Sequence, residues 1–214
     1  MSRFVLAAVG LAAGIIGLAA PASAATLTPL SYTFDQPTNT GAYTYNDTGA
    51  ELIDGILGTA GWAYNAGVEW DGWVSVPQVN IDFNFGSAKT FNSVSVGSTQ
   101  DNPFDVVLPN LNIFSSLNGV AWTFRGSLAT PVSNANNVSP YSSAPHGFLT
   151  VGGLNFSAPF VRVQAVNNGP WIFVDEVRFQ GSGGVPEPAA WSLMLLGFGV
   201  AGASLRRRRP AQRV

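Results

Sequence analysis

Apolar and polar side chains alternate strictly over Val79-Asn80-Ile81-Asp82-Phe83-Asn84-Phe85. Because successive side chains of a β-strand point to opposite faces, this pattern predicts a strand with one buried side and one solvent-facing side. Short runs rich in valine, isoleucine, phenylalanine and threonine recur between clusters of glycine, asparagine, proline and serine. They predict further strands at residues 91–96, 111–115, 121–126, 148–151, 160–165 and 172–180. The sequence therefore predicts an all-β domain, a β-sandwich or jelly roll.

A different pattern lies at the amino terminus. Arg3 precedes an apolar run over residues 4–20, and Ala22-Ser23-Ala24 follows it. A positive charge, an apolar run and a small-residue site in this order predict a secretory signal peptide over residues 1–24, cleaved after Ala24 by signal peptidase. A permanent membrane helix is the alternative, but the small-residue site and the proline before it end the run.

The carboxy terminus carries three features in a fixed order. Pro186-Glu187-Pro188 cannot continue a helix, residues 189–205 are apolar and uncharged, and Arg206-Arg207-Arg208-Arg209 follow. At about 1.5 Å per residue the apolar run nearly spans a bilayer core, and the arginines mark its cytoplasmic side. This predicts a single transmembrane helix over residues 189–205, with residues 210–214 as a cytoplasmic tail.

This order of features resembles the PEP-CTERM sorting signal of Gram-negative bacteria. The resemblance covers residues 185–209 and follows a short glycine-rich linker at residues 182–184. It implies that an exosortase cleaves near Pro186-Glu187-Pro188. The precursor stays tethered to the inner membrane until this cleavage, and its body then reaches the cell surface or the extracellular matrix. An ordinary carboxy-terminal membrane anchor is the alternative.

Composition limits what the body of the chain, residues 25–181, can bind. It holds four basic and eleven acidic residues. This balance argues against nucleic acid and anionic membrane surfaces as partners, and suits neutral glycans or divalent cations. The absence of cysteine excludes a disulfide scaffold and thiolate chemistry. The single histidine, His146, lies in a loop rich in serine and proline and is expected to be exposed rather than catalytic.

Several short motifs follow one another between residues 52 and 179. They are Leu52-Ile53-Asp54-Gly55 followed by Trp62, the strand end Phe85-Gly86, the turn Ser115-Ser116-Leu117-Asn118-Gly119-Val120-Ala121-Trp122, and the strands Phe160-Val161-Arg162-Val163 and Val174-Asp175-Glu176-Val177. Together they resemble the discoidin or coagulation-factor C-type family of galactose-binding-like jelly rolls. The resemblance implies that fold, although Asn118 stands where that family has aspartate.

The same resemblance places Asp54 close to Glu176 on the last strand, where many bacterial relatives hold a structural Ca²⁺. Ca²⁺ requires clustered carboxylate and carbonyl oxygens, and Asn46-Asp47-Thr48 can add to them. The alternative is that Asp54 caps its own Asx-turn and Glu176 is solvated. Arg162, in the middle of a predicted strand, is expected to pair with Asp175 or Glu176.

Aromatic residues gather in the first half of the body, around Glu69-Trp70-Asp71-Gly72-Trp73. Glycan sites stack exposed aromatic faces on sugar rings and fix the hydroxyls with a few polar groups. Trp70, Asp71 and Trp73 are therefore predicted to bind a glycan, with packing in the core as the alternative. Glu69 with Asp71 also has the composition of a glycosidase pair, but adjacent carboxylates are common in loops. Core packing is expected for the other tryptophans of the body, Trp62, Trp122 and Trp171.

These patterns together predict an exported, non-enzymatic β-sandwich module that binds polysaccharide at the cell surface or in the matrix. The expected partners are signal peptidase, an exosortase, polysaccharide and, before processing, the inner membrane. The alternatives are a purely structural matrix or adhesion protein without a small ligand, and an envelope glycan hydrolase, which the sparse catalytic residues disfavour.

Overall fold

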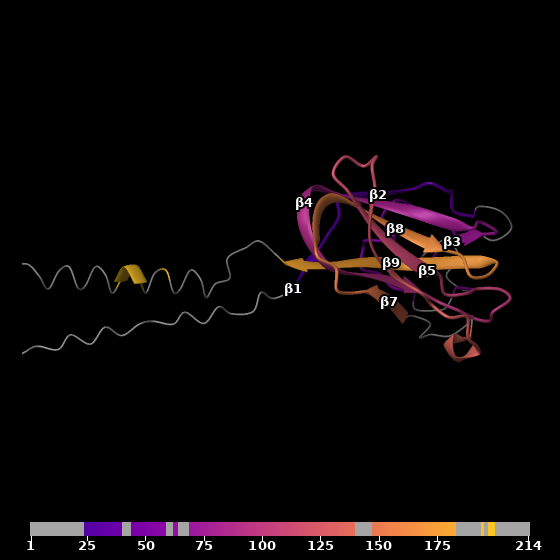
Figure 1. The fold of residues 1–214 in the computed structure, drawn as a ribbon. Helices are drawn as coiled ribbons and strands as arrows, with labels where there is room; N and C mark the ends of the chain where they lie inside the picture. Colours follow the sequence, from indigo (N-terminus) through magenta and orange to yellow (C-terminus); the bar gives the residue numbers. More distant parts are fainter. Residues whose placement is uncertain are drawn as a thin grey trace, which may run out of the picture.

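The computed structural model describes residues 24–39, 44–58, 62–63, 69–139, 147–182, 194 and 197–199 of the 214-residue chain. Its strands are β1 (Ala24–Leu27), β2 (Ser31–Phe34), β3 (Asp71–Val74), β4 (Gln78–Ser98), β5 (Asn110–Ser116), β6 (Thr123–Leu128), β7 (Gly147–Val151), β8 (Phe156–Val166) and β9 (Trp171–Ser182), and one 3₁₀ helix, η1 (Asn134–Asn136), follows β6 (Figure 1). The described body is therefore all β, which confirms the predicted fold class.

The strands form two layers that share β4. In one layer β2, the first half of β4, β8, β5 and β6 lie side by side, all antiparallel. In the other layer β7, the second half of β4 and β9 pair, and both β1 and β3 pair with β9. Layers that face each other across one core make a β-sandwich.

Strand β4 passes from one layer to the other. The sequence predicts two strands here, at residues 79–85 and 91–96, but the structure has one strand of 21 residues. Its pairing with β8 shifts register between Asn84 and Lys89, and Gly86 adopts a φ of 70°. A bulge with a glycine in the left-handed region bends a strand sharply, so the two predicted strands are the two arms of one bent strand.

The alternation in the first arm of β4 places its apolar residues in the core. Val79, Ile81 and Phe83 are fully buried, whereas Asp82 and Asn84 lie on the outer face of the layer. Complete burial of each such side chain contributes ~1.5–3 kcal/mol. The main core continues through Val94, Val96, Leu111, Ile113, Val161, Val163, Ile172, Val174 and Phe179.

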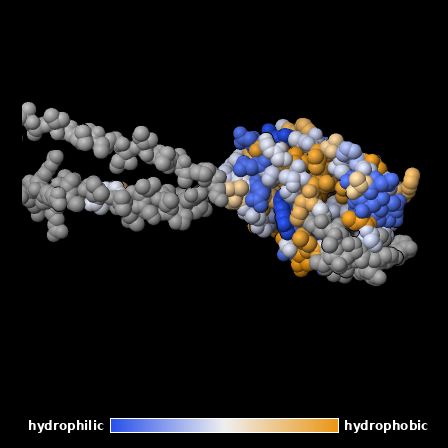
Figure 2. Space-filling model, turned by 90° about the horizontal axis from the view of Figure 1, so that it is seen from below, coloured by the Kyte–Doolittle hydropathy of each residue, from blue (hydrophilic) through white to orange (hydrophobic). Residues whose placement is uncertain are grey.

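Hydrophobic and hydrophilic residues are interspersed on the face of the body that Figure 2 shows. Both ends of the body lie at one end of the sandwich, because Ala24 pairs with Ser182 (Figure 1). Strand β1 thus begins at the residue after which cleavage is expected. Strand β3 and the end of β2 lie at the opposite end of the sandwich.

The predicted processing signals fall mostly outside the described residues. This is true of the signal peptide before Ala24, the motif Pro186-Glu187-Pro188, the arginines Arg206 to Arg209, and also His146. Of the predicted membrane span, residues 189–205, only residues 194 and 197–199 are described, and their backbone is helical. Within the described part of the chain, no helix has both the length and the apolar character needed to cross a membrane.

Candidate functional site

The predicted glycan group of Trp70, Asp71 and Trp73 lies in the interior. Trp70 and Trp73 are 1% exposed and Asp71 is 0% exposed. Strand β3 pairs with β9 and is covered on both faces, and Trp70 lies so close to Gly58 that a Cβ there would come within 2.3 Å of the indole. Because a covered ring cannot stack on a sugar, these three residues do not form an exposed site, which corrects the prediction.

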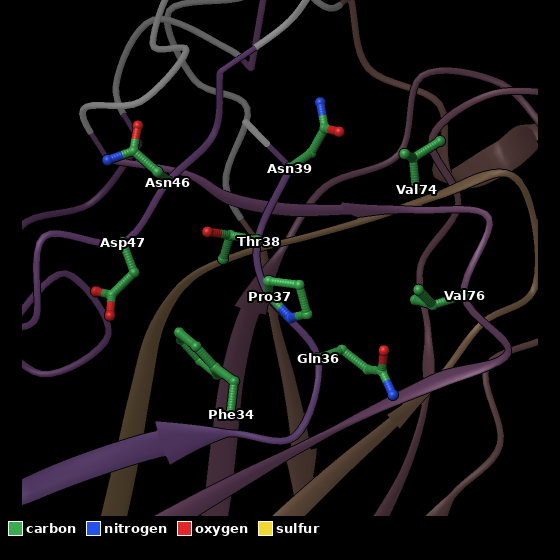
Figure 3. Close-up of a pocket in the computed structure, with 9 residues that line it drawn as sticks. All are labelled: Phe34, Gln36, Pro37, Thr38, Asn39, Asn46, Asp47, Val74 and Val76. Carbon is green, nitrogen blue, oxygen red and sulfur yellow. The ribbon is translucent and has the colours of Figure 1, made fainter. Parts of the chain in front are cut away.

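A pocket of about 600 Å³ opens beside this strand, at the end of the sandwich remote from Ala24 and Ser182. It is lined by Phe34, Gln36, Pro37, Thr38, Asn39, Asn46, Asp47, Val74 and Val76 (Figure 3). In Figure 3 the two valines lie across the pocket from Phe34 and Asp47, with the segment from Gln36 to Asn39 between them. We call it the loop-end pocket.

The buried strand β3 supports this pocket from inside. The Trp73 ring meets Phe34 edge-on with centroids 5.1 Å apart, and its Nε1 donates to the Gln36 carbonyl at 3.2 Å. The backbone N–H of Asn39 donates to the Gly72 carbonyl at 2.8 Å. The predicted segment therefore borders a cavity, but its side chains position the lining residues instead of contacting solvent.

Of the lining residues, the sequence singles out only Asn46 and Asp47, as possible Ca²⁺ ligands, and none as a glycan-binding residue. Gln36, Thr38, Asn39 and Asn46 precede the first predicted strand, at residues 79–85, and such polar residues are ordinary in loops. The signal present in the sequence is a high share of amide and hydroxyl side chains over residues 36–46. These polar residues form a pocket only because the loop folds back against Val74 and Val76.

Acidic side chains surround one edge of the loop-end pocket. The Tyr32 hydroxyl donates a short hydrogen bond to Asp47 Oδ1. Burial, followed by a hydrogen bond with Glu51, raises the pKa of Asp47. Burial opposes ionisation of Glu51 as well, but hydrogen bonds from Asp47 and from the backbone N–H of Thr48, at 2.8 Å, lower the pKa of Glu51 to about 2. The edge therefore carries a firmly held negative charge on Glu51.

Asp71 lies behind this edge, and its carboxyl group has a raised pKa. Neither of its carboxyl oxygens has a hydrogen-bond partner among the described residues. Burial, followed by the charges of Asp47 and Glu51, raises the pKa of Asp71 to about 9. Asp71 is therefore protonated and neutral at pH 7, as expected for a carboxyl group that is taken out of water next to other carboxylates.

The structure brings the loop of Asp54 to Glu176, as the family resemblance implies. Glu176 Oε2 accepts a hydrogen bond from the Gly55 N–H at 3.1 Å. Burial raises the pKa of Glu176 to about 7, Gly55 and Arg178 oppose the shift, and the charge of Asp54 adds to it. Asp54 Oδ1 also accepts from the Ile56 N–H at 2.8 Å, which is the Asx-turn of the alternative interpretation.

Asp54 and Glu176 suit Ca²⁺ because they bring together two carboxylates whose negative charges repel each other. A cation between Asp54 and Glu176 would remove that repulsion, and Ca²⁺ would need further oxygen ligands beside these two carboxylates. The guanidinium of Arg178, 3.8 Å from Glu176, competes for the same carboxylate. Over the described ranges, His, Cys, Asp and Glu side chains form no group of three or more with metal-binding geometry.

Arg162 pairs differently from the expectation. It binds Asp82 through two hydrogen bonds of 2.6 and 2.8 Å, and not Asp175 or Glu176. The register of β4 with β8 explains the difference, because it places Arg162 opposite Asp82 on the outer face of the sheet. Trp122, expected in the core, is only half-buried and lies on the same outer face, where the Arg162 guanidinium is 4.3 Å from its ring centroid.

Comparisons with known proteins agree with both the predicted sorting signal and the predicted fold of the body. The family model described as the PEP-CTERM protein-sorting motif matches residues 184–209. The chain therefore carries this sorting signal, which implies export, a membrane-anchored precursor and processing by an exosortase. A comparison with curated protein sequences found no match.

Among solved structures, the sandwich resembles family 32 carbohydrate-binding modules. One, from Clostridium perfringens in complex with GalNAc-β-1,3-galactose, has a TM-score of 0.50 and 11% identity, and the alignment covers 72% of this chain and 99% of that chain. Truncated AlyQ, with its family 32 module and alginate lyase domains, gives a TM-score of 0.50 and 15% identity over 76% of this chain and 34% of that chain. The chain thus spans about a third of that second structure. At such identities the likeness establishes the fold, a discoidin-like, galactose-binding-like β-sandwich, which confirms the resemblance seen in the sequence.

Proposed function

We propose that this protein is an exported, non-catalytic module that binds polysaccharide in its loop-end pocket. The observation that carries the proposal is the position and composition of that pocket. It lies beside β3, which pairs with the start of β9, whereas Ala24 pairs with the last residue of β9, Ser182, at the opposite end of the sandwich. The pocket combines an apolar wall with amide, hydroxyl and carboxylate groups. A module tethered by its terminal end presents this pocket outward.

The chemistry of the lining suits a sugar. Phe34, Val74 and Val76 offer apolar contact to the non-polar face of a sugar ring. Gln36 and Asn46 offer both hydrogen-bond donors and acceptors, and Asp47 offers an acceptor that Tyr32 holds in place. A single sugar ring can use only a few of these groups at once, so we expect weak binding to one sugar, strengthened where a polymer repeats it.

The count of carboxylates supports a non-catalytic role. Hydrolysis of a glycosidic bond uses two carboxyl groups that flank the bond. Asp47 is the one carboxylate in the described lining of the loop-end pocket, and it shares a hydrogen bond with Glu51 behind it. The family 32 modules that share the fold are carbohydrate-binding, which also favours binding over hydrolysis.

The sorting signal supports a destination for this binding module. We infer that signal peptidase removes residues 1–24, that residues 189–205 hold the precursor in the inner membrane, and that exosortase cleavage near Pro186-Glu187-Pro188 passes the body to the surface or matrix. A binding module delivered there can reach polysaccharide outside the cell. The proposed binding and the proposed destination are therefore consistent.

We also propose that Asp54 and Glu176 hold a structural Ca²⁺. The support is that the loop of Asp54 lies against Glu176, whose pKa is raised to about 7 mainly by burial, with the charge of Asp54 adding to the shift. The Gly55 N–H bond to Glu176 fixes the loop against β9 whether or not a cation is bound. A bound Ca²⁺ would add stability to this contact, and it takes no part in the binding chemistry of the loop-end pocket.

Gel retardation of the full chain, purified in detergent, tests polysaccharide binding. We expect retardation in gels that contain galactomannan, and a loss of most of it in the double variant Gln36→Ala with Asn46→Ala. The matched control is Asn92→Ala, which removes an exposed amide from the second arm of β4, away from the pocket. Equal retardation of the double variant and the control would exclude the loop-end pocket. Absence of retardation across a panel of neutral and acidic polysaccharides would favour the purely structural alternative.

A further inference from the structure

A second concave site lies on the outer face of the layer that contains β2, β4, β8 and β5. It is a cup of about 220 Å³ lined by Ser31, Tyr32, Thr33, Asp82, Asn84, Gly119, Trp122 and Phe160. It shares no lining residue with the loop-end pocket, which is bordered by Phe34 and the segment after it. Because Thr33 and Phe34 are neighbours on β2, they point to opposite faces of that strand and the two sites are separate.

The aromatic wall of the cup is held rigidly. The Arg162 guanidinium lies 4.3 Å from the Trp122 ring centroid, and its two hydrogen bonds to Asp82 fix its orientation. Because the guanidinium is held by Asp82 and lies over the indole face, it keeps the Trp122 ring in one position. Trp122 remains half-buried, so part of its surface is available to a ligand in the cup.

The turn that carries Trp122 is also fixed. Asn118 Oδ1 accepts from the N–H groups of Val120 and Ala121 at 2.9 and 3.0 Å, and Ser116 Oγ accepts from the Gly119 N–H at 2.9 Å. Gly119 adopts a φ of 74°, a conformation that favours glycine. A rigid turn loses little conformational entropy when a ligand binds against it, which favours binding.

The rest of the lining is polar, and its charged group, Asp82, is paired with Arg162. Ser31 and Thr33 are exposed on β2, and their hydroxyls make no hydrogen bond within the described part of the chain. The same holds for Nδ2 of Asn84, whose Oδ1 accepts from the Gly86 N–H at 2.8 Å. The cup therefore places two aromatic rings, Trp122 and Phe160, opposite free hydroxyl and amide groups.

A row of amides continues from the cup across the sheet. Asn80 Nδ2 donates to Asp35 at 2.6 Å, Gln164 Nε2 donates to Asn80 at 2.9 Å, and Asn112 Nδ2 donates to Gln164 at 2.9 Å. The row lies next to the Asp82–Arg162 pair, whose charges cancel. The outer face thus offers an ordered array of donors and acceptors, with the Asp35 carboxylate as the charged end of the row.

We propose that this outer face is a second carbohydrate-binding surface that takes a stretch of neutral polysaccharide. One sugar ring occupies the cup against Trp122 and Phe160, with its hydroxyls bonded to Thr33 and Asn84. The neighbouring sugars of the chain lie along the part of the amide row that is not buried, at Gln164 and Asn112. The ligand class is that of the proposed function, but the residues are different. A protein with both sites links two polysaccharide chains.

The test fills the cup without removing any buried contact. Thr33→Arg places a bulky cation in the cup from an exposed strand position, and Ser31→Arg does so from two residues away. The matched control is Thr150→Arg, an exposed strand position in the other layer. Thermal unfolding of each full-chain variant, followed by circular dichroism, verifies that the fold is retained.

Binding is measured by gel retardation in galactomannan, a neutral polymer, and in alginate, an anionic one. We expect Thr33→Arg and Ser31→Arg to bind galactomannan at least about threefold more weakly than Thr150→Arg, and Gln36→Ala with Asn46→Ala to keep the part of the binding that the cup supplies. If both cup variants bind galactomannan as the control does, the second site is refuted while the loop-end pocket stands. If the wild type binds alginate alone, the neutral surface is refuted. If it binds neither polymer, this inference fails together with the proposed function.

Discussion

Trp73 and Phe34 meet edge-on with ring centroids 5.1 Å apart, although they come from opposite layers of the sandwich. Phe34 lines the loop-end pocket, and Trp73 is buried directly behind it. The contact joins the layers at the end of the body remote from Ala24 and Ser182. The Trp73 ring therefore affects both the stability of the core and the shape of the pocket.

The two roles of Trp73 can be separated by substitution. Trp73→Ala removes a fully buried ring and is expected to cost ~3–5 kcal/mol of unfolding free energy. Trp73→Phe keeps an aromatic ring but loses the hydrogen bond to the Gln36 carbonyl, so we expect a smaller loss of ~1 kcal/mol together with weaker galactomannan binding. Urea unfolding and gel retardation measure the two effects. Unchanged binding in a folded Trp73→Phe protein would contradict the supporting role of this ring.

Asp71 makes the stability of the body depend on pH. Its pKa is about 9 in the folded protein, against an ordinary value of 3.8. Because the folded pKa is raised, the stabilising contribution of Asp71 is complete below pH 3.8 and is lost as the pH rises through about 9. Each unit of pKa difference corresponds to ~1.4 kcal/mol.

Asp71→Asn tests this dependence with an almost isosteric side chain that does not ionise. We expect the variant to be more stable than the wild type at pH 8 and to lose less stability between pH 4 and pH 9. Thermal unfolding over that range measures both, and the exposed substitution Asn92→Ala serves as the control. Parallel wild-type and Asp71→Asn curves would show that Asp71 ionises normally in the folded state.

The proposed Ca²⁺ at Asp54 and Glu176 predicts a response to chelator. We expect the melting temperature to fall when EDTA is added and to recover with excess Ca²⁺, and we expect Glu176→Gln to remove this response. Because the pKa of Glu176 is about 7, the stabilisation by Ca²⁺ should increase between pH 6 and pH 8 as the carboxylate ionises. Asp101→Asn is a control acid outside the pair. A melting temperature that is indifferent to EDTA and Ca²⁺ at pH 8 sinks the metal proposal.

The sorting motif predicts a processing event in a host that has an exosortase. An internally tagged chain should lose its carboxy-terminal segment and leave the inner membrane, whereas a chain with Glu187→Ala should keep that segment and stay in the membrane fraction. Immunoblots of membrane, surface and medium fractions measure this. The control is the same pair of chains in a strain without the exosortase, where both should remain uncut. Identical processing of both chains in the complete host would argue for an ordinary anchor.

Local patterns predicted most of the fold because they depend on neighbouring residues. The alternation over residues 79–85 correctly assigns the buried and outer side chains of the first arm of β4. It does not reveal that residues 79–85 and 91–96 belong to one bent strand, because the bend depends on a register shift against β8. The turn at Asn118-Gly119 was likewise recognised from its composition, but the cup beside it was not.

The candidate sites were harder to predict, since they depend on which strands become neighbours. An aromatic and acidic segment such as residues 69–73 looks the same in sequence whether it is exposed or covered. Pairing of β3 with β9, as in Asp71 opposite Val174, decides that it is covered. The partner of Arg162 was mistaken for the same reason, because only the register of β4 with β8 places Asp82 beside it.

The sequence by itself determined the all-β character of the body and the order of motif, apolar run and arginines that makes the sorting signal, because both are properties of residues close together in the chain. The tertiary structure alone decided that Trp70, Asp71 and Trp73 are interior, that a pocket opens in front of Trp73, and that Trp122 lies over Arg162. Burial and pocket shape arise from contacts between strands distant in sequence, and a period of two along one strand does not specify which strand will lie beside it.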